Sequence, residues 1–175
     1  MADEAPIVLV GYDPSWPGQF GWERDNLLRL IRDWLVGPIE HIGSTAVPGL
    51  AAKPVIDIVA GVESLEASRS AIPVLCTSGY CYSPYRPDIE HWFCKPSPAF
   101  RTHHLHLVPY KSALWNAQIG FRDYLRSHSR VAQEYEELKH DLASRYRDDR
   151  EGYTDAKGAF VRHILKLIDQ GSRSG

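Results

Sequence analysis

The sequence has few of the residues that mark several large classes of protein. Its three cysteines, Cys76, Cys81 and Cys94, are odd in number and form neither a C-x-x-C pair nor a zinc-ribbon spacing, so a disulfide framework is not expected. No apolar run approaches the roughly 20 residues of a membrane-spanning helix. The N-terminus, MADEAPIVLV, has acids where a signal peptide has basic residues. These absences predict a cytoplasmic protein with reduced thiols and no membrane association.

An excess of positive charge is also missing. Twenty Lys and Arg against 22 Asp and Glu give a net charge of -2, which supplies no general attraction to nucleic acids or anionic lipids. Any recognition of phosphate must therefore be local. The sequence also lacks a Gly-x-Ser-x-Gly elbow, a Walker-type Gly-Lys-Ser/Thr loop and a basic neighbourhood around any cysteine. These absences argue against a cysteine or serine nucleophile and against a P-loop.

The length and the hydrophobic periodicity favour one domain. We expect a single domain over residues 1–175 with a disordered tail at 171–175, because a chain of 175 residues can bury one substantial core. Apolar residues recur at helical spacing up to Gly37-Pro38, which ends the first predicted helix. Three more helices fill the last third, the final one capped by Thr154 or Asp155. Between them the pattern predicts two strands within 41–62, a helix at 64–75, and strands at 79–85, 89–95 and 101–108. This order indicates an α+β or α/β fold with a mixed sheet.

The segment His41–Val62, HIGSTAVPGLAAKPVIDIVAGV, contains the most chemically informative residues. It predicts a strand, a Gly-Ser turn, a short helical excursion and a second strand. Backbone N–H groups after Gly43 and the hydroxyls of Ser44 and Thr45 can donate to a phosphate, although either hydroxyl would equally serve as a helix cap. Asp57 lies among apolar residues, where a carboxylate needs a metal ion, a cation or several donors.

Further motifs extend over nearly the whole chain. They are Y-D-P-x-W at 12–16, the central HIGSTAVPGLAAKPVIDI, G-Y at 79–80, R-x-x-H-L-H at 101–106, F-R-D-Y-L-R at 121–126 and Y-x-x-x-K-x-x-F at 153–160. The Gly-Ser turn followed by an acid-bearing strand resembles the nucleotidyltransferase superfamily typified by polymerase beta. More closely, the whole set resembles the GrpB family, which is placed in that fold. The resemblance implies a nucleotidyltransferase-like fold and a nucleotide or similar phosphorylated ligand.

One departure from the superfamily pattern bears on metal chemistry. Two-metal transfer uses about three carboxylates to hold its metal ions. The superfamily pattern would place a second acid two residues after Asp57 and a third on a later strand. This chain has Val59 at the first of these positions, and His104 and His106 on the later strand. One interpretation is that Asp57, His104 and His106 bind a single divalent ion, Mn, Zn or Mg, with imidazole favouring Zn or Mn. Another is that no catalytic metal is present and the histidines contact an anionic ligand directly. Two histidines that only form hydrogen bonds on a strand are the structural alternative.

Other basic residues are candidates for the same ligand. Lys53 lies just before the Asp57 strand, Arg101 begins the histidine strand, and Lys157 is near the start of the last helix. Arg122 lies four residues before Arg126 and therefore shares one helical face with it. A solvated surface charge is the alternative for each.

These observations favour a nucleotidyltransferase-fold protein that binds a nucleotide or another phosphorylated small molecule and catalyses nucleotidyl or related transfer. Asp57, His104 and His106 are the predicted catalytic residues. Two alternatives remain open. One is a non-catalytic ligand-binding or regulatory module, for which related domains fused to dephospho-coenzyme A kinase suggest a link to coenzyme A. The other is a single-metal enzyme unrelated to nucleotides. The aromatic residues fit a core and a dimer contact equally well, so the oligomeric state is open.

Overall fold

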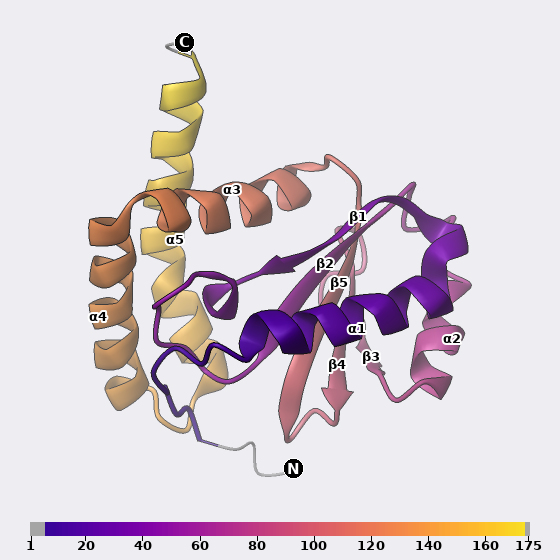
Figure 1. Ribbon diagram of the computed structural model, residues 1–175, viewed down its shortest axis with the longest axis horizontal. Coiled ribbons are helices and arrows are strands. Elements are labelled where there is room, and N and C mark those ends of the chain that lie inside the picture. The colour runs from indigo at the N-terminus through magenta and orange to yellow at the C-terminus, as the bar shows by residue number, and fades with distance from the viewer. Residues whose placement is uncertain (1–5, 174–175) are drawn as a thin grey trace.

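The computed structural model describes residues 6–173; residues 1–5, with the N-terminal acids, and residues 174–175 lie outside it. At its centre is one sheet of five strands: β1 (Leu35–Ile42), β2 (Ile56–Val62), β3 (Cys81–Ser83), β4 (His91–Pro96) and β5 (Arg101–Pro109). The strand order is β1-β2-β5-β4-β3, with β2 and β5 parallel and the other neighbours antiparallel (Figure 1). The predicted mixed sheet is confirmed, and the fold is of the α+β class.

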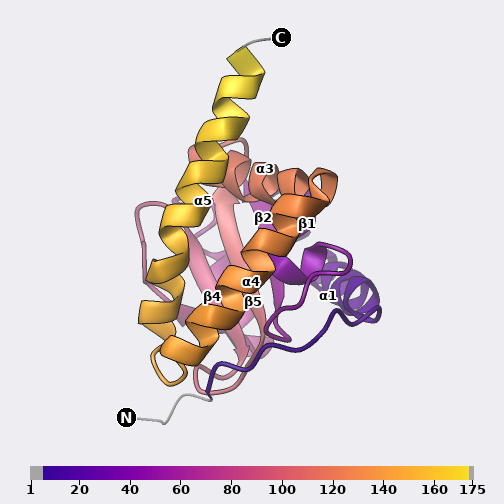
Figure 2. The ribbon, with the colours of Figure 1, turned by 90° about the vertical axis from the view of Figure 1, so that its left-hand side faces the viewer.

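The helices cover both faces of this sheet. They are α1 (Trp16–Ile31), α2 (Ala71–Thr77), α3 (Ala113–Ser127), α4 (Ser129–Arg145) and α5 (Arg150–Arg173). On the α1 side, Leu105 and Leu107 of β5 are fully buried, which confirms that the apolar face of this strand is the core side. On the other side, Trp115 of α3 packs against Val59 and Val108, and α4 and α5 stand in front of the sheet in Figure 2.

No helix within residues 6–173 combines the length and the apolar character needed to cross a membrane.

The first helix ends earlier than the apolar spacing predicts. α1 stops at Ile31 and is followed by a 3-10 turn, η1 (Arg32–Trp34), and β1 then contains both Gly37 and Pro38. The prediction that Gly37-Pro38 ends the helix is therefore wrong. A Cβ atom at Gly37 would lie 2.4 Å from the ring of Tyr110, so glycine is needed where the strand passes under this side chain. Helical periodicity carries no information about that tertiary contact.

The last helix differs from the prediction at both ends. The Asp149 carboxylate accepts a hydrogen bond of 2.8 Å from the N–H of Gly152, so α5 begins earlier than the cap predicted at residues 154–155. At the other end, residues 171–173 are helical, whereas the rest of the tail predicted at 171–175 lies outside the described residues. Because α5 begins at Arg150, its first turns lie beside the sheet.

The region between β2 and β5 has shorter elements than predicted. Turns occupy most of residues 64–70, so α2 forms only the last part of the predicted helix. The predicted strands at 79–85 and 89–95 shrink to β3 and β4. Pro84 and Pro87 lie in the loop between them, where the absence of a proline N–H does not interrupt the sheet.

Candidate functional site

Side chains on the sheet face opposite α1 form two neighbouring rows. In one row, Asp57 of β2 lies beside His104 of β5, which lies beside Cys94 of β4. In the next row, His106 lies beside Trp92. Side chains alternate along a strand, so the parallel register of β2 and β5 places an acid and an imidazole side by side. The sequence predicts the face that each residue occupies but not this register.

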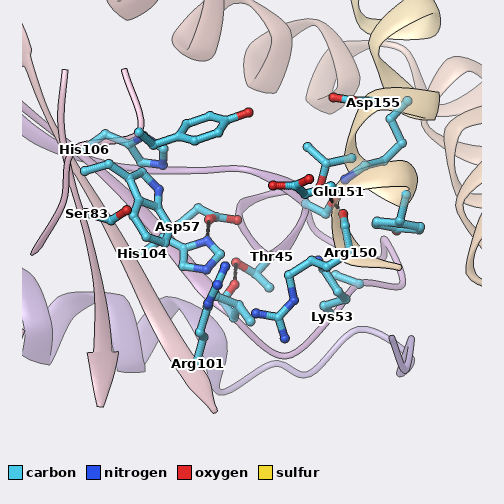
Figure 3. Close-up of a pocket in the computed structure, with 18 of the residues that line it drawn as sticks. Thr45, Lys53, Asp57, Ser83, Arg101, His104, His106, Arg150, Glu151 and Asp155 are labelled. Carbon is cyan, nitrogen blue, oxygen red and sulfur yellow. Dashed lines mark hydrogen bonds and ion pairs between the residues drawn. The ribbon is translucent and has the colours of Figure 1, made fainter. Parts of the chain in front are cut away.

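These rows form one wall of a cavity of about 570 Å³. Its opposite wall comes from the beginning of α5, which contributes Arg150, Glu151 and Asp155 (Figure 3). Polar residues from segments far apart in the sequence therefore line one partly open cavity between the sheet and the last helix. Its volume is in the range of small-molecule sites, roughly 300 to 1,000 Å³.

Asp57 and His104 form a hydrogen-bonded pair. The distance from His104 Nδ1 to Asp57 Oδ1 is 2.8 Å, and Nδ1 carries the proton because a carboxylate can only accept. Burial raises the pKa of Asp57, but the hydrogen bond and charge of His104, with His106 and Lys53, outweigh burial and lower it. Burial lowers the pKa of His104 although Asp57 opposes the shift. The lowered pKa favours the neutral imidazole, and the buried Nε2 atom of His104 has no hydrogen-bond partner among residues 6–173.

His106 belongs to a second carboxylate–imidazole pair. Its Nδ1 atom lies 2.5 Å from Oε2 of Glu90. The Glu90 side chain is fully buried, and its other oxygen accepts two hydrogen bonds from Arg86 at 2.9 and 2.5 Å. The two histidines share a sheet face, yet different carboxylates hold them.

The predicted metal ligands are not gathered into one group in the described part of the chain. Within the described part of the chain, no three His, Cys, Asp or Glu side chains are grouped so that they could hold a metal ion. Asp57 is paired with His104, and His106 is paired with Glu90. Both contacts use Nδ1 and leave Nε2 of each histidine outside the pairs, so a single ion held by Asp57, His104 and His106 stays a prediction.

The Gly-Ser turn lies against Asp57. Gly43 has a φ of 71°, and a Cβ atom there would lie 2.5 Å from Asp57 Oδ2. The hydroxyl of Thr45 donates to the Val55 carbonyl at 3.1 Å and lies 2.9 Å from Nε2 of His41. Thr45 thus anchors the turn to the strand that carries Asp57, and its hydroxyl is already used. His41 is itself buried, and this burial lowers its pKa to about 4.

Ser44 contacts a lysine that sequence reasoning missed. Lys139 of α4 is 2% exposed, and its Nζ donates to Ser44 Oγ at 3.1 Å and to the carbonyl of Ala51. Burial lowers the pKa of Lys139 to about 8, against the charge of Glu136. Lys139 lies four residues after Tyr135, and both are buried on the same face of α4 with Leu142. A charged residue on a buried helical stripe is the signal that would have identified it.

Two further lysines flank an aromatic ring in the cavity. Nζ of Lys157 lies 4.3 Å from the ring centroid of Tyr153, and Nζ of Lys53 lies 4.9 Å from it. Burial lowers the pKa of Lys157 to about 7, and the charges of Lys53 and Lys139 add to this effect while Asp57 opposes it. Among residues 6–173 Lys157 has no ion pair with a carboxylate. The cavity therefore holds ammonium groups close together in a poorly solvated place.

Arg122 lies outside the cavity. Its guanidinium forms an ion pair with Glu40 at 2.7 Å and donates to the carbonyl of His41 at 2.9 Å. Arg126 donates to the carbonyl of Ala46 at 2.8 Å. These two arginines hold the backbone on either side of the Gly-Ser turn, so the position of Arg122 does not support the prediction that it contacts a ligand.

The other predicted residues meet in one place. Those that line the cavity are Ser44, Thr45, Lys53, Asp57, Arg101, His104, His106 and Lys157. Gly43 lies directly behind Asp57. The cavity is also lined by three residues that the sequence did not predict, Glu90, Trp92 and Tyr153. A sequence does not show which face of a short strand or helix another element will cover.

Fold and site together define an α+β protein whose mixed sheet presents an acid–histidine pair to a cavity rich in lysine and arginine. The family model described as GrpB protein matches residues 6–167. The chain belongs to the GrpB family.

Similar proteins agree with this assignment. The chain is 38% identical to the "Glutamate-rich protein GrpB" of Alkalihalophilus pseudofirmus, with 93% of this chain and 96% of that protein covered. The crystal structure of conserved protein GrpB from Enterococcus faecalis has a TM-score of 0.85 and 32% identity, covering 94% and 99% of the two chains. A stretch of 90 residues is 40% identical to a dephospho-CoA kinase of Mycolicibacterium paratuberculosis, covering 50% of this chain and 20% of that protein.

Proposed function

We propose that the cavity binds the phosphate group of a small phosphorylated molecule. The observation that carries this proposal is the cluster of Lys53, Lys139 and Lys157, in which burial and neighbouring cations lower the pKa of Lys157 to about 7. Holding ammonium groups together away from water is costly. A bound anion would offset that cost, since it would interact favourably with all three charges.

Other features support the same ligand class. Ser44 Oγ faces Lys139 at 3.1 Å, so a hydroxyl and an ammonium group lie together beside the Gly-Ser turn. The resemblance of this turn and strand to the nucleotidyltransferase superfamily points to a phosphorylated ligand as well. The dephospho-CoA kinase that matches half of this chain bears the name of an enzyme acting on a phosphorylated compound, which makes dephospho-coenzyme A a suitable test ligand.

Sulfate binding is expected to weaken as the pH rises. Sulfate keeps its charge in this range, and its contact with Lys157 requires the ammonium form, whose pKa in the unliganded protein is about 7. Affinity should therefore fall about tenfold or more between about pH 6.5 and about pH 8.5. Isothermal titration calorimetry at several pH values measures this directly.

Two substitutions of the same residue act as matched controls. Lys157→Met should bind sulfate weakly at every pH, whereas Lys157→Arg keeps the positive charge and should lose most of the pH dependence. In Lys157→Arg, sulfate affinity should still depend weakly on pH, because Lys139, with a pKa of about 8, loses part of its charge over the same range. Unchanged sulfate affinity in Lys157→Met would argue against the proposed anion site.

Transfer at phosphorus is a second candidate function, favoured by one specific atom. Nε2 of His104 is buried without a partner, while Asp57 fixes the opposite nitrogen as the protonated one. In this hypothesis Nε2 accepts the proton of an attacking hydroxyl as its oxygen bonds to phosphorus, and the phosphorus–oxygen bond to the leaving group breaks. The proton then passes to the departing oxygen. This is general base catalysis by an oriented imidazole.

Asp57→Asn is expected to reduce such a transfer about 100-fold or more, because the amide no longer fixes the reactive tautomer of His104. Turnover of ribonucleoside triphosphates and dephospho-coenzyme A would be followed with and without Mg²⁺, Mn²⁺ or Zn²⁺. Glu151→Gln is the control, since it removes a carboxylate from the same cavity without disturbing the pair. A wild-type protein that binds these compounds but converts none of them would rule out transfer and leave a binding or regulatory module.

A further inference from the structure

The cavity has a second end whose chemistry differs from that of the lysine cluster. Trp92 of β4 faces the cavity, and Tyr85, just after β3, lines its edge. Tyr85 is 66% exposed. On the opposite face of the same strand, Phe93 is fully buried in the core. Trp92 is thus set apart from the core, on the wall of a cavity, where an indole ring can contact a ligand.

Arginine side chains already lie over both rings. Cζ of Arg101 is 5.3 Å from the Trp92 ring centroid, and Cζ of Arg86 is 5.7 Å from that of Tyr85. A guanidinium is a flat group that stacks on aromatic faces. The rings at this end therefore already pack against planar groups. A heteroaromatic group would stack on these rings with its whole face.

The sheet register fixes the position of Trp92 relative to the reactive residues. Trp92 lies beside His106 in the register of β4 and β5, and its ring centroid is 5.2 Å from that of His104. The indole thus borders the acid–histidine pair on the side of β4, while Lys53 and Lys157 approach the cavity from other segments. One ligand with a planar head and an anionic tail can contact both ends.

We infer that Trp92 is the platform of a nucleobase subsite, so that the phosphorylated ligand of this cavity is a nucleotide. This inference rests on the proposed function, because it assigns the part of the ligand that the lysine cluster does not contact. A base stacked on Trp92 lies between the indole and the guanidinium of Arg101 or takes the place of that guanidinium. Stacking tolerates every base, so the platform by itself recognises nucleotides as a class.

The test compares ligands that share one phosphate chain. Inorganic tripolyphosphate and the ribonucleoside triphosphates of adenine, guanine, cytosine and uracil are titrated into the full chain by isothermal titration calorimetry. At least one nucleotide should bind about tenfold or more tightly than tripolyphosphate, the contribution typical of one stacked base. This comparison uses the wild-type protein and does not depend on the folding of any variant.

Substitutions then assign the difference to one ring. Trp92→Leu should reduce nucleotide affinity to that of tripolyphosphate without changing tripolyphosphate binding, whereas Trp92→Phe keeps an aromatic face and should retain most of the preference. Trp22→Leu is the control, because Trp22 is 84% exposed on α1, away from the cavity. Lys157→Met should weaken both ligands alike.

The possible failures are distinct. If tripolyphosphate binds as tightly as every nucleotide, or if Trp92→Leu keeps the full preference, the nucleobase subsite is overturned while the phosphate site stands. If neither tripolyphosphate nor any nucleotide binds, the proposed function itself fails. A nucleotide preference that Tyr85→Ser abolishes and Trp92→Leu does not would also overturn the assignment of Trp92 as the platform.

Discussion

Replacing Glu23 with alanine is expected to lower the free energy of unfolding by about 3 kcal/mol. Glu23 of α1 is 7% exposed. Its carboxylate accepts a hydrogen bond of 2.6 Å from the hydroxyl of Tyr80 and forms an ion pair with Lys95 of β4. Alanine would leave a largely buried ammonium group and a buried hydroxyl without their partner, and an unpaired buried charge is among the most destabilising changes in a protein.

Urea unfolding of the wild type and variants at constant pH measures this loss. Glu66→Ala removes an exposed glutamate and should change stability by no more than about 0.5 kcal/mol. The double substitution Glu23→Leu with Lys95→Met replaces both charges by apolar groups and should recover much of the stability. An unfolding midpoint of Glu23→Ala equal to that of Glu66→Ala would show that the buried pair contributes little.

The pH dependence of the Glu23→Ala effect has a defined sign. Burial raises the pKa of Glu23, but Lys95 and Tyr80 outweigh burial, so the folded-state pKa lies below the ordinary value of 4.5. A carboxylate whose pKa is lowered by folding stabilises the protein above its unfolded pKa and loses that contribution as the pH falls. The difference between wild type and Glu23→Ala should therefore shrink below pH 4.5.

The sequence pattern predicts this fold well where the relevant interactions are local. Strand alternation correctly assigns Leu105 and Leu107 to the core and His104 and His106 to the other face. A strand, a Gly-Ser turn, a short helical excursion and a second strand with Asp57 occur in that order. In each case residues a few positions apart determine the outcome, through sterics and side-chain periodicity.

The missed features depend on segments far apart in the chain. Lys139 binds Ser44 across 95 residues, and His106 binds Glu90 across 16. Arg122 was expected at the ligand because it shares a helical face with Arg126, but its ion pair with a residue of β1, 82 positions away, fixes it behind the turn. No local pattern specifies which surface α3 or α4 will cover. A single sequence therefore indicates which kinds of residue form the site, but not every residue that lines it.

Gly43→Ala is expected to disrupt the site severely. A Cβ atom at Gly43 would lie 2.5 Å from Oδ2 and 3.0 Å from Cβ of Asp57. Asp57 cannot simply rotate away, because its other oxygen accepts the hydrogen bond from His104. Either the turn or the acid–histidine pair must shift. Together with the strained φ, this should reduce stability by about 3 kcal/mol and abolish ligand binding.

Gly49→Ala is a matched control for the backbone contribution. Gly49 has a φ of 81°, similar to the 71° of Gly43, but a Cβ atom there meets nothing within 4 Å. Its substitution should therefore cost only the left-handed backbone strain, about 1 to 2 kcal/mol, and leave sulfate binding intact. Equal losses of stability in the two variants would contradict the importance of the close approach. If the clash is the cause, Asp57→Ala should cost much less in the Gly43→Ala background than in the wild type, because it removes the carboxylate oxygen with which the added Cβ collides. Such non-additivity would show that the glycine of the turn is required by the carboxylate beside it.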